Sequence, residues 1–510
     1  GRRTMPQDAP DDWETFKAYN RRDVEVEQAI LAKVRRLEQP EWEERLYHID
    51  QRINDRGVEV SRRLVENADR MNTLYMEQLV QQAKALTGLD NPNSPAQLKK
   101  WLEEEAHVSA ATLNKKGVDD LIGLVGRTTK AGKMLYLRRE MGKTSNKKYA
   151  AILDCLCHDG RIHGLLQYYG AARTGRWASR LVQVQNLPQN HMQDIDSARR
   201  MVMSGDLDEF SLCYSSPMQA LSELIRTAFV AKEGHALRVC DFSAIEARVI
   251  AWLAGEEWVL DVFRGGGDVY CATATQMFGV KVEKHGQHSE LRQKGKIAVL
   301  ALGYGGGKAA LEAMGGAKMG LSDVEMLDIV NKWRNANPNI VRLWGNVEKA
   351  AIRTCTTGRD TCINRGLEFA MRYGYLTVKL PSGRLMCYPR ARVEDFEKTY
   401  GGTRSELTRA VRYEGINQNT KKWERIETYG GKMTENIVQA IARDILGTVM
   451  LRAYEEHMNI VFHVHDEIIV EAPPSLTLQR VEALFGQKIE WAQGLPLKGA
   501  GYSTPYYLKG

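Results

Sequence analysis

The sequence FHVHDEIIVE, residues 462–471, places a histidine and two acids between two apolar runs rich in β-branched residues. The runs Ile460–Val464 and Ile468–Val470 have the composition of buried strands. A tight turn between two strands usually contains Asn-Gly or Asp-Gly, whereas this turn contains His-Asp-Glu. Acidic side chains in such a turn are tolerated, and useful, when a metal ion neutralises them. The stretch therefore predicts an antiparallel hairpin that carries a metal-dependent site.

A second acid, Asp241, follows another apolar stretch. Residues 236–240 (ALRVC) predict a buried strand, and a helical pattern begins directly after the acid. Apolar residues then recur on one helical face, at Ile245, Val249 and Trp252. A purely structural role is also open here, because Ser243 and Glu246 have the spacing of a capping box, and an acid near a helix start suits the helix dipole.

A third element is the basic pattern LRQKGKIAVLALGYGGG at 291–307. One broad helical face carries a residue every fourth position, at Arg292, Lys296, Leu300 and Tyr304. Cations in the first turns of a helix oppose its dipole, so the helix itself gains nothing from them. They are useful if an anion such as a triphosphate binds to that face. The alternative is a pair of solvated cations on a surface helix.

The three elements together indicate phosphoryl transfer. Asp241 and Asp466, each at the end of a strand, can hold two Mg²⁺ ions, and Mn²⁺ is a plausible substitute. Two metals roughly 3.5–4 Å apart can activate an attacking hydroxyl and stabilise the leaving oxygen of an in-line displacement. A basic helix would then balance the charge of the transferred group.

The composition of the chain is compatible with this chemistry. The chain has 510 residues, of which 43% are hydrophobic and 26% charged, as in an ordinary globular protein, and its net charge of +7 is compatible with a polyanionic partner without requiring one. We find no long apolar stretch and no secretory signal, so we expect no membrane association and a cytoplasmic setting, in a bacterial or phage-infected cell.

Strand and helix signals alternate along the chain in large blocks. A charged helix is predicted over 13–38 and a polar helical region over 41–165, with a basic cluster at 142–149. Strands are predicted at 375–389 and 411–426, and a helix over 434–457 leads into the opening hairpin. Strands in two distant places with helices between them predict an α+β core with a helical insertion.

The motifs resemble those of family A DNA polymerases, the bacterial polymerase I type. Asp241-Phe-Ser-Ala-Ile-Glu246-Ala-Arg248 is similar to their A motif, Arg292-x3-Lys296-x7-Tyr304-Gly305 to their B motif, and His465-Asp466-Glu467 to their C motif. Similar template–primer elements are present at Thr174-Gly175-Arg176, at Gln185-Asn186-Leu187-Pro188 and at Gln439-x4-Asp444. The order and spacing of the motifs agree with the family from about residue 45 onward.

The resemblance implies a DNA-templated DNA polymerase that acts as a monomer on primer–template DNA and dNTPs with two Mg²⁺ ions. The implied metal ligands are Asp241 and Asp466. The other implied catalytic residues are Glu467, an accessory acid, and Lys296. The implied nucleotide-binding residues are Arg292, Lys296, Tyr304, Tyr270, Leu300 and Glu246, the last as the steric gate against a ribose 2′-hydroxyl. The implied nucleic-acid contacts are Arg176, Gln185, Asn186, Arg248, Gln439 and His465.

The resemblance also implies a right-hand fold with an antiparallel-sheet palm, helical fingers and a helical thumb. The expected ranges are 41–165 for the thumb, 166–248 and 376–510 for the palm, and 249–375 for the fingers. Tyr19 and Asp23 resemble the third motif of a 3′–5′ exonuclease, so residues 1–40 are expected to be the end of such a domain, without proofreading in this chain.

Several positions depart from the family pattern. Leu300 replaces an aromatic residue, Tyr270 replaces a histidine, and Phe242 and Ala244 replace tyrosine and glutamine. A long stretch separates QNLP from LIRTAF, at about 189–220, and residues 411–432 resemble an insertion found in phage and prophage members.

Other functions remain open from the sequence. A single-subunit RNA polymerase is disfavoured by Glu246, while reverse transcription stays possible. A metal phosphohydrolase would use His463, His465 and Asp466 as ligands, but no matching downstream ligands follow. A non-catalytic nucleic-acid binder with the same fold is the third alternative.

Overall fold

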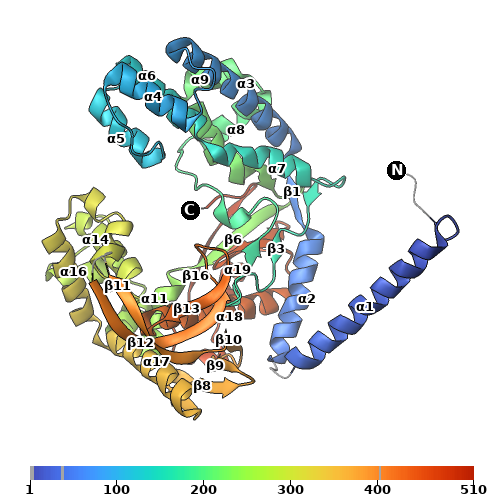
Figure 1. Ribbon diagram of the computed structural model, residues 1–510, viewed down its shortest axis with the longest axis vertical. Helices are drawn as coiled ribbons and strands as arrows, with labels where there is room; N and C mark the ends of the chain where they lie inside the picture. The colour runs from blue at the N-terminus through green and yellow to red at the C-terminus, as the bar shows by residue number, and fades with distance from the viewer. Residues whose placement is uncertain (1–4, 36–38, 401–403, 510) are drawn as a thin grey trace.

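The computed structural model describes residues 5–35, 39–400 and 404–509. Two helical units flank a central region of sheets and helices, and the expected α+β class is confirmed (Figure 1). Within the described ranges, every helix is either too short or too polar to traverse a lipid bilayer. The helix predicted over 13–38 is α1, Pro10–Val34, which buries none of its residues; residues 36–38 lie outside the described ranges.

The central sheet has the strand order β14-β15-β6-β16, and all its strand pairs are antiparallel. Its strands are β6 (Ala236–Phe242), β14 (Ile460–Val464), β15 (Glu467–Ala472) and β16 (Gly499–Thr504). The predicted hairpin and the predicted strand after residue 236 are therefore neighbours. Every residue of β14 and β15 is buried, as are the apolar residues Leu237, Val239 and Cys240 of β6, which specifies the register of the sheet.

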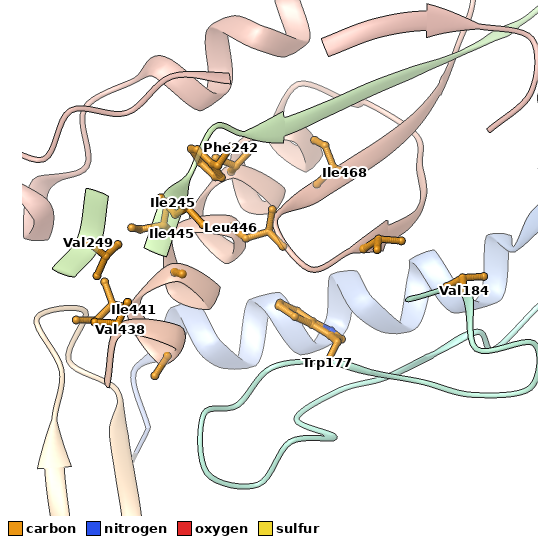
Figure 2. Packing of buried hydrophobic residues seen from close by; sticks show 14 of the residues in the cluster. Trp177, Val184, Phe242, Ile245, Val249, Val438, Ile441, Ile445, Leu446 and Ile468 are labelled. Carbon is orange, nitrogen blue, oxygen red and sulfur yellow. The ribbon is translucent and has the colours of Figure 1, made fainter. Parts of the chain in front are cut away.

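Helix α18 (Gly430–Glu455) forms the main core beneath this sheet, and most of its residues are buried. It packs against α2 (Glu41–Arg56), α11 (Ile245–Ala254) and α17 (Pro338–Thr357). Figure 2 shows its side chains Val438, Ile441, Ile445 and Leu446 next to Ile245, Val249 and Ile468. The helix is buried on nearly all sides, and its buried polar residues Arg443 and Asp444 take part in ion pairs.

A helical arm rises from one side of the core, at the top of Figure 1. Its helices are α3 (Arg62–Thr87), α4 (Pro95–Ala106), α5 (Lys115–Val125), α6 (Lys130–Met141) and α7 (Lys147–Cys155). The outer helices have a separate small core that includes Leu98, Trp101 and Leu135. The long stretch at 189–220 folds as helices that pack on or near α3, namely α8 (Ile195–Ser204), α9 (Leu207–Cys213) and α10 (Pro217–Leu224).

A second helical unit lies on the left in Figure 1. Its helices are α12 (Glu257–Arg264), α13 (Val269–Phe278), α14 (Ser289–Leu302), α15 (Lys308–Ala313) and α16 (Asp323–Ala336). The predicted basic helix is α14, which packs closely on α13. It ends at Leu302, so Tyr304 lies just beyond the helix rather than on its last turn.

Two further sheets flank α17. One has the order β10-β9-β8-β7, with β7 (Thr361–Ile363), β8 (Leu367–Arg372), β9 (Tyr375–Lys379) and β10 (Leu385–Pro389). The other consists of β11 (Arg392–Tyr400), β12 (Arg404–Ile416) and β13 (Trp423–Thr428). Strands predicted at 375–389 and 411–426 are confirmed, whereas β11 and the start of β12 are not evident from the sequence because charged residues dominate them.

The remaining elements join the arm to the core. A small sheet has the order β2-β1-β5, with β1 (Val58–Val60), β2 (Arg161–Ile162) and β5 (Phe229–Val230). A short hairpin pairs β3 (Leu166–Gln167) with β4 (Ala178–Ser179), and α19 (Leu478–Gly486) packs on β6 and β16.

Candidate active site

Three acids meet at the edge of the central sheet. Asp241 on β6 lies directly opposite Glu467 on β15. The backbone amide of Phe242 donates to the carbonyl oxygen of Asp466 at 3.2 Å. The turn is tight because His465 adopts a left-handed backbone conformation, with φ of 55°. Two rigid strand ends therefore bring together the two acids that the sequence analysis paired.

Burial at this edge of the sheet disfavours the ionised form of the carboxyl groups. It raises the pKa of Asp466 to about 6, with the charge of Asp241 as the second cause, and it raises the pKa of Glu467 to about 7. The pKa of Asp241 is raised for the same reason, while the nearby ammonium group of Lys509 lowers it in part. A divalent cation would neutralise the buried negative charge and remove the repulsion between the carboxylates. Asp241 and Asp466 therefore fit the expected pair of metal ions.

Glu467 is held from behind by a chain of hydrogen bonds. The Tyr507 hydroxyl donates to the Glu467 carboxylate at 2.6 Å, and Arg226 Nη1 donates to the Tyr507 hydroxyl oxygen at 2.9 Å. All three side chains are buried. Neither Tyr507 nor Arg226 was predicted, since no local pattern links residues so far apart in the sequence.

A cavity of about 410 Å³ adjoins the acids. Its lining includes seven predicted site residues: Arg176, Glu246, Tyr270, Leu300, Tyr304, His465 and Asp466. Burial lowers the pKa of His465, and Lys509 and Arg176 lower it further. The cavity thus joins residues from the turn between β14 and β15, from α11, α13, α14 and the residues just after it, and from the loop before β4.

Glu246 is hydrogen-bonded to two other side chains that line this cavity. Its carboxylate accepts from Arg176 Nη2 at 2.6 Å and from the Tyr304 hydroxyl at 2.7 Å. The pKa of Tyr304 is raised well above its ordinary value by burial and by this carboxylate. The capping box considered for Ser243 and Glu246 is wrong, because α11 begins after Ala244 and has no side-chain cap. The Glu246 carboxylate instead accepts hydrogen bonds from Arg176 and Tyr304, which lie outside α11.

Of the two basic residues predicted on one face of α14, Arg292 is paired and, within the described ranges, Lys296 is not. Arg292 donates to Asp268 through Nε at 2.9 Å and Nη2 at 2.7 Å, and its guanidinium carbon lies 5.4 Å from the Tyr270 ring centroid. Asp268 also caps α13 by accepting from the amides of Tyr270 and Cys271. Lys296 has no ion pair among the described residues. Asp268 was missed, although an Asp before a helical run is a recognisable cap signal.

The loop that carries Arg176 is clamped by two buried arginines. Arg384 Nη2 donates to the Thr174 carbonyl at 2.8 Å, and Arg443 Nε donates to the Gly175 carbonyl at 2.9 Å. Arg384 Nε pairs with Asp444 at 2.7 Å, and both side chains are fully buried. Asp444 thus anchors the loop through Arg384, a role that its sequence pattern did not reveal.

The remaining predicted nucleic-acid contacts differ in exposure. Asn186 is exposed, and Gln185 and Gln439 are half-buried, with Gln439 one turn after Glu435, from which it is 3.4 Å away. The predicted contact of Arg248 with nucleic acid is wrong. Its side chain is only 4% exposed and donates to the carbonyls of Ser243 and Pro496, so it braces the turn after β6.

His463 excludes the ligand set considered for a phosphohydrolase. Its side chain is buried, neither ring nitrogen has a hydrogen-bond partner, and its ring centroid lies 4.5 Å from that of Trp177. Burial lowers its pKa to about 3. It therefore packs in the core against Trp177. Among the described residues, no group of three or more His, Cys, Asp or Glu side chains has the arrangement of a metal cluster.

Comparison with known proteins gives a consistent set of relatives. The model of the family "DNA polymerase family A" matches residues 62–499. The chain is 48% identical over 508 residues to a DNA polymerase of Bacillus phage SP02, covering 99% of this chain and 77% of the relative. It is 26% identical over 369 residues to the thermostable DNA polymerase I of Thermus thermophilus, covering 71% of this chain but only 34% of that longer protein.

A solved structure shares the fold. The POL domain of Pol1 from M. smegmatis, in complex with DNA primer-template and dNTP, superposes with a TM-score of 0.58 at 18% sequence identity. The match covers 88% of this chain and 67% of that one. The expected right-hand architecture is confirmed at the level of fold.

Proposed function

We propose, from the premise that this chain belongs to DNA polymerase family A, that it extends a DNA primer with dNTPs on a DNA template. One observation carries the proposal. The register of β6 and β15 sets Asp241 beside the turn that contains Asp466, and Asp466 lines a cavity together with Glu246 and Tyr304. Acids and a nucleotide-sized cavity in one place are what nucleotidyl transfer requires.

Asp241 and Asp466 would hold two Mg²⁺ ions, with Mn²⁺ as a substitute. When bound, the ions would activate the primer 3′-hydroxyl and stabilise the charge on the leaving pyrophosphate. The protein's part is to fix both carboxylates on rigid strand ends and to keep the site partly dry, which strengthens each electrostatic contact. Glu467, held by Tyr507, supports the geometry of the turn from the buried side.

The incoming dNTP would bind between α14 and the acids. Lys296, which has no ion pair among the described residues, and Arg292 would bind its phosphates, with Asp268 holding Arg292 ready until the nucleotide arrives. Tyr270 would lie beside the phosphates and Leu300 beside the sugar or base, since both line the cavity. Tyr304 would close the pocket over the nascent base pair.

The duplex would lie between the arm and the central sheet. Arg176 and Gln439 would contact its backbone or minor groove and read shape rather than sequence. Gln185, Asn186 and His465 would contact the primer or template strand nearby. We assign α3–α7 to the thumb, α12–α16 to the fingers, and the central sheet with α18 to the palm. Helix α2, within the expected thumb range, packs on α18 and β14 and so joins the palm.

The enzyme is expected to work as a monomer in the cytoplasm of a bacterial or phage-infected cell, in keeping with its phage relative. A labelled primer annealed to a DNA template tests the proposal. Extension should require template, dNTPs and Mg²⁺ together and should stop on addition of a chelator. Hydrolysis of dNTPs without a primer would favour a phosphohydrolase. Metal-independent DNA binding with no turnover would favour a non-catalytic binder.

Glu246→Ala should raise ribonucleotide use relative to dNTP use by at least about tenfold, because it removes the bulk that would clash with a 2′-hydroxyl. Single-nucleotide addition with paired rNTP and dNTP measures this ratio. Glu246→Gln is the matched control, since it keeps the bulk and the bond from Arg176. An unchanged ratio in Glu246→Ala would leave Glu246 only the task of joining Arg176 to Tyr304.

The rate of nucleotide addition should fall as the pH drops below about 6. Burial raises the pKa of Asp466 to about 6, and only the ionised carboxylate binds metal, so protons compete with Mg²⁺. Raising the Mg²⁺ concentration should therefore move the acidic limb to lower pH. The measurement is the single-turnover rate against pH at two Mg²⁺ concentrations. A limb that does not move with Mg²⁺ would belong to a group that does not bind the metal.

A further inference from the structure

The three-stranded sheet β11–β13 has no task in the chemistry described above. It lies in orange beside α17 in Figure 1, near α14 and α16, while the arm α3–α7 lies at the top of the view. One face packs inward through Val411 and Tyr413, which contacts Tyr388 of β10 at 5.0 Å between ring centroids. Beyond this packed base, the hairpin end between β12 and β13 is exposed over residues 418–423.

The tip of this hairpin presents an exposed tryptophan among basic and amide side chains. Trp423 is 60% exposed and pairs across the hairpin with Ile416, which is 59% exposed. Lys421 and Lys422 are exposed in the turn, and neither takes part in an ion pair with a residue whose side chain is described. Both acids near Trp423 have hydrogen-bond partners: Glu414 accepts from Trp423 Nε1 and from Arg390, and Glu424 accepts from the side-chain amide of Asn417.

The tip lies beside the loop that carries Arg176. Arg173 Nη2 donates to the Ile416 carbonyl at 3.3 Å, and its guanidinium carbon lies 5.4 Å from the Tyr413 ring centroid. Three residues later, Arg176 bonds Glu246 inside the nucleotide cavity. The hairpin is therefore linked by a short rigid path to one side of the nascent-pair pocket.

The other end of β13 leads to the opposite side of the same pocket. Through Tyr429 it enters the first turn of α18, where a Cβ on Gly431 would lie 2.3 Å from the Tyr304 carbonyl oxygen. Only glycine permits so close a contact. The sheet is thus tied through Arg173 to the loop that carries Arg176, and through the start of α18 to the backbone of Tyr304, and it lies apart from the arm α3–α7 in Figure 1.

We propose that the β12–β13 tip binds the single-stranded template segment entering the nascent-pair pocket, with a base stacked on Trp423 and phosphates bound by Lys421 and Lys422. This rests on the proposed polymerase function. Stacking needs an unpaired base, because paired bases hide their faces within the duplex. A protein partner fits less well, because two isolated apolar side chains fall far short of the roughly 1,000 Å² that a stable interface buries.

The test compares two DNAs that share one primer–template duplex, one blunt and one with a 5′ template overhang. Without dNTP, Trp423→Ala should weaken binding of the overhang DNA about tenfold and leave the blunt duplex unchanged. Trp13→Ala is the control, because Trp13 is also an exposed tryptophan, 38% exposed, but lies on α1, which Figure 1 shows on the other side of the molecule from β13. Trp423→Phe should retain most of the affinity, which separates lost stacking from misfolding.

A second variant tests the phosphate contacts. Replacing both Lys421 and Lys422 with alanine should lower the slope of log Kd against log salt by about 1.4 for the overhang DNA, at ~0.7 per single-strand phosphate. Equal losses of affinity for the blunt and the overhang DNA would overturn the assignment to single-stranded template. Unchanged affinity for both DNAs would mean that this surface does not bind DNA. Because binding is measured without turnover, failure of primer extension would not by itself decide this result.

Discussion

Replacing Asp466 with asparagine is expected to lower the rate of primer extension about a thousandfold while leaving primer–template binding nearly unchanged. Asparagine keeps the shape of the turn but removes the charge that would hold the metal, a loss of several kcal/mol at the transition state. Single-turnover nucleotide addition and equilibrium DNA binding measure the two effects. Asp328→Asn, on the exposed face of α16 and paired there with Lys332, is the matched control.

The same substitution should stabilise the protein in the absence of metal. The pKa of Asp466 is raised from 3.8 to about 6, so ionisation destabilises the folded state as the pH rises through that range. Removing the charge should increase the free energy of unfolding near pH 7.5 by about 1–3 kcal/mol. Substantial residual extension by Asp466→Asn would mean that Asp466 does not bind the metal. A lower Tm of this variant without metal would mean that the buried charge of Asp466 does not destabilise the protein.

Replacing Arg384 with alanine is expected to destabilise the protein by about 3–5 kcal/mol, because it leaves the fully buried Asp444 carboxylate without its main partner. Thr174 would also lose the bond to its carbonyl, so the Arg176 loop should loosen and dNTP use should fall. Denaturant unfolding measures the first effect. Arg372→Ala is the control, since its exposed pair with Asp360 should contribute under about 1 kcal/mol.

Two results would contradict this view of the buried pair. A loss of stability no greater than that of Arg372→Ala would mean that Asp444 becomes neutral at little cost. Burial does raise the pKa of Asp444, while Arg384 and Arg443 lower it. Full stability with impaired dNTP use would instead assign Arg384 to the loop alone.

The parts of the site with local sequence signals could be predicted. Strand-then-acid patterns identified Asp241 and Asp466, and two apolar runs rich in β-branched residues identified β14 and β15, which the structure pairs. The four-residue spacing on α14 correctly grouped Leu300 and Tyr304 on one cavity, although Tyr304 lies past the helix end. Such signals persist because backbone periodicity and burial act over short distances.

The parts that depend on distant partners could not be predicted. The sequence spacing allowed a capping box for Glu246. In the structure, its carboxylate accepts hydrogen bonds from Arg176 and Tyr304 instead of from the backbone at the start of its own helix. Arg248 belongs to a motif yet turns inward to two carbonyls. Glu467 meets Tyr507, 40 residues away. These choices are set by tertiary packing, to which no local pattern in the sequence corresponds.

The most direct measurement is single-nucleotide addition to one primer on four DNA templates that differ only in the templating base, with Mg²⁺ and each dNTP offered alone. We expect rapid addition of the complementary dNTP on each template, no addition without Mg²⁺, and near-complete loss of addition in Asp466→Asn. Addition that ignores the templating base, or that persists in Asp466→Asn, would contradict templated, carboxylate-dependent nucleotidyl transfer at this site.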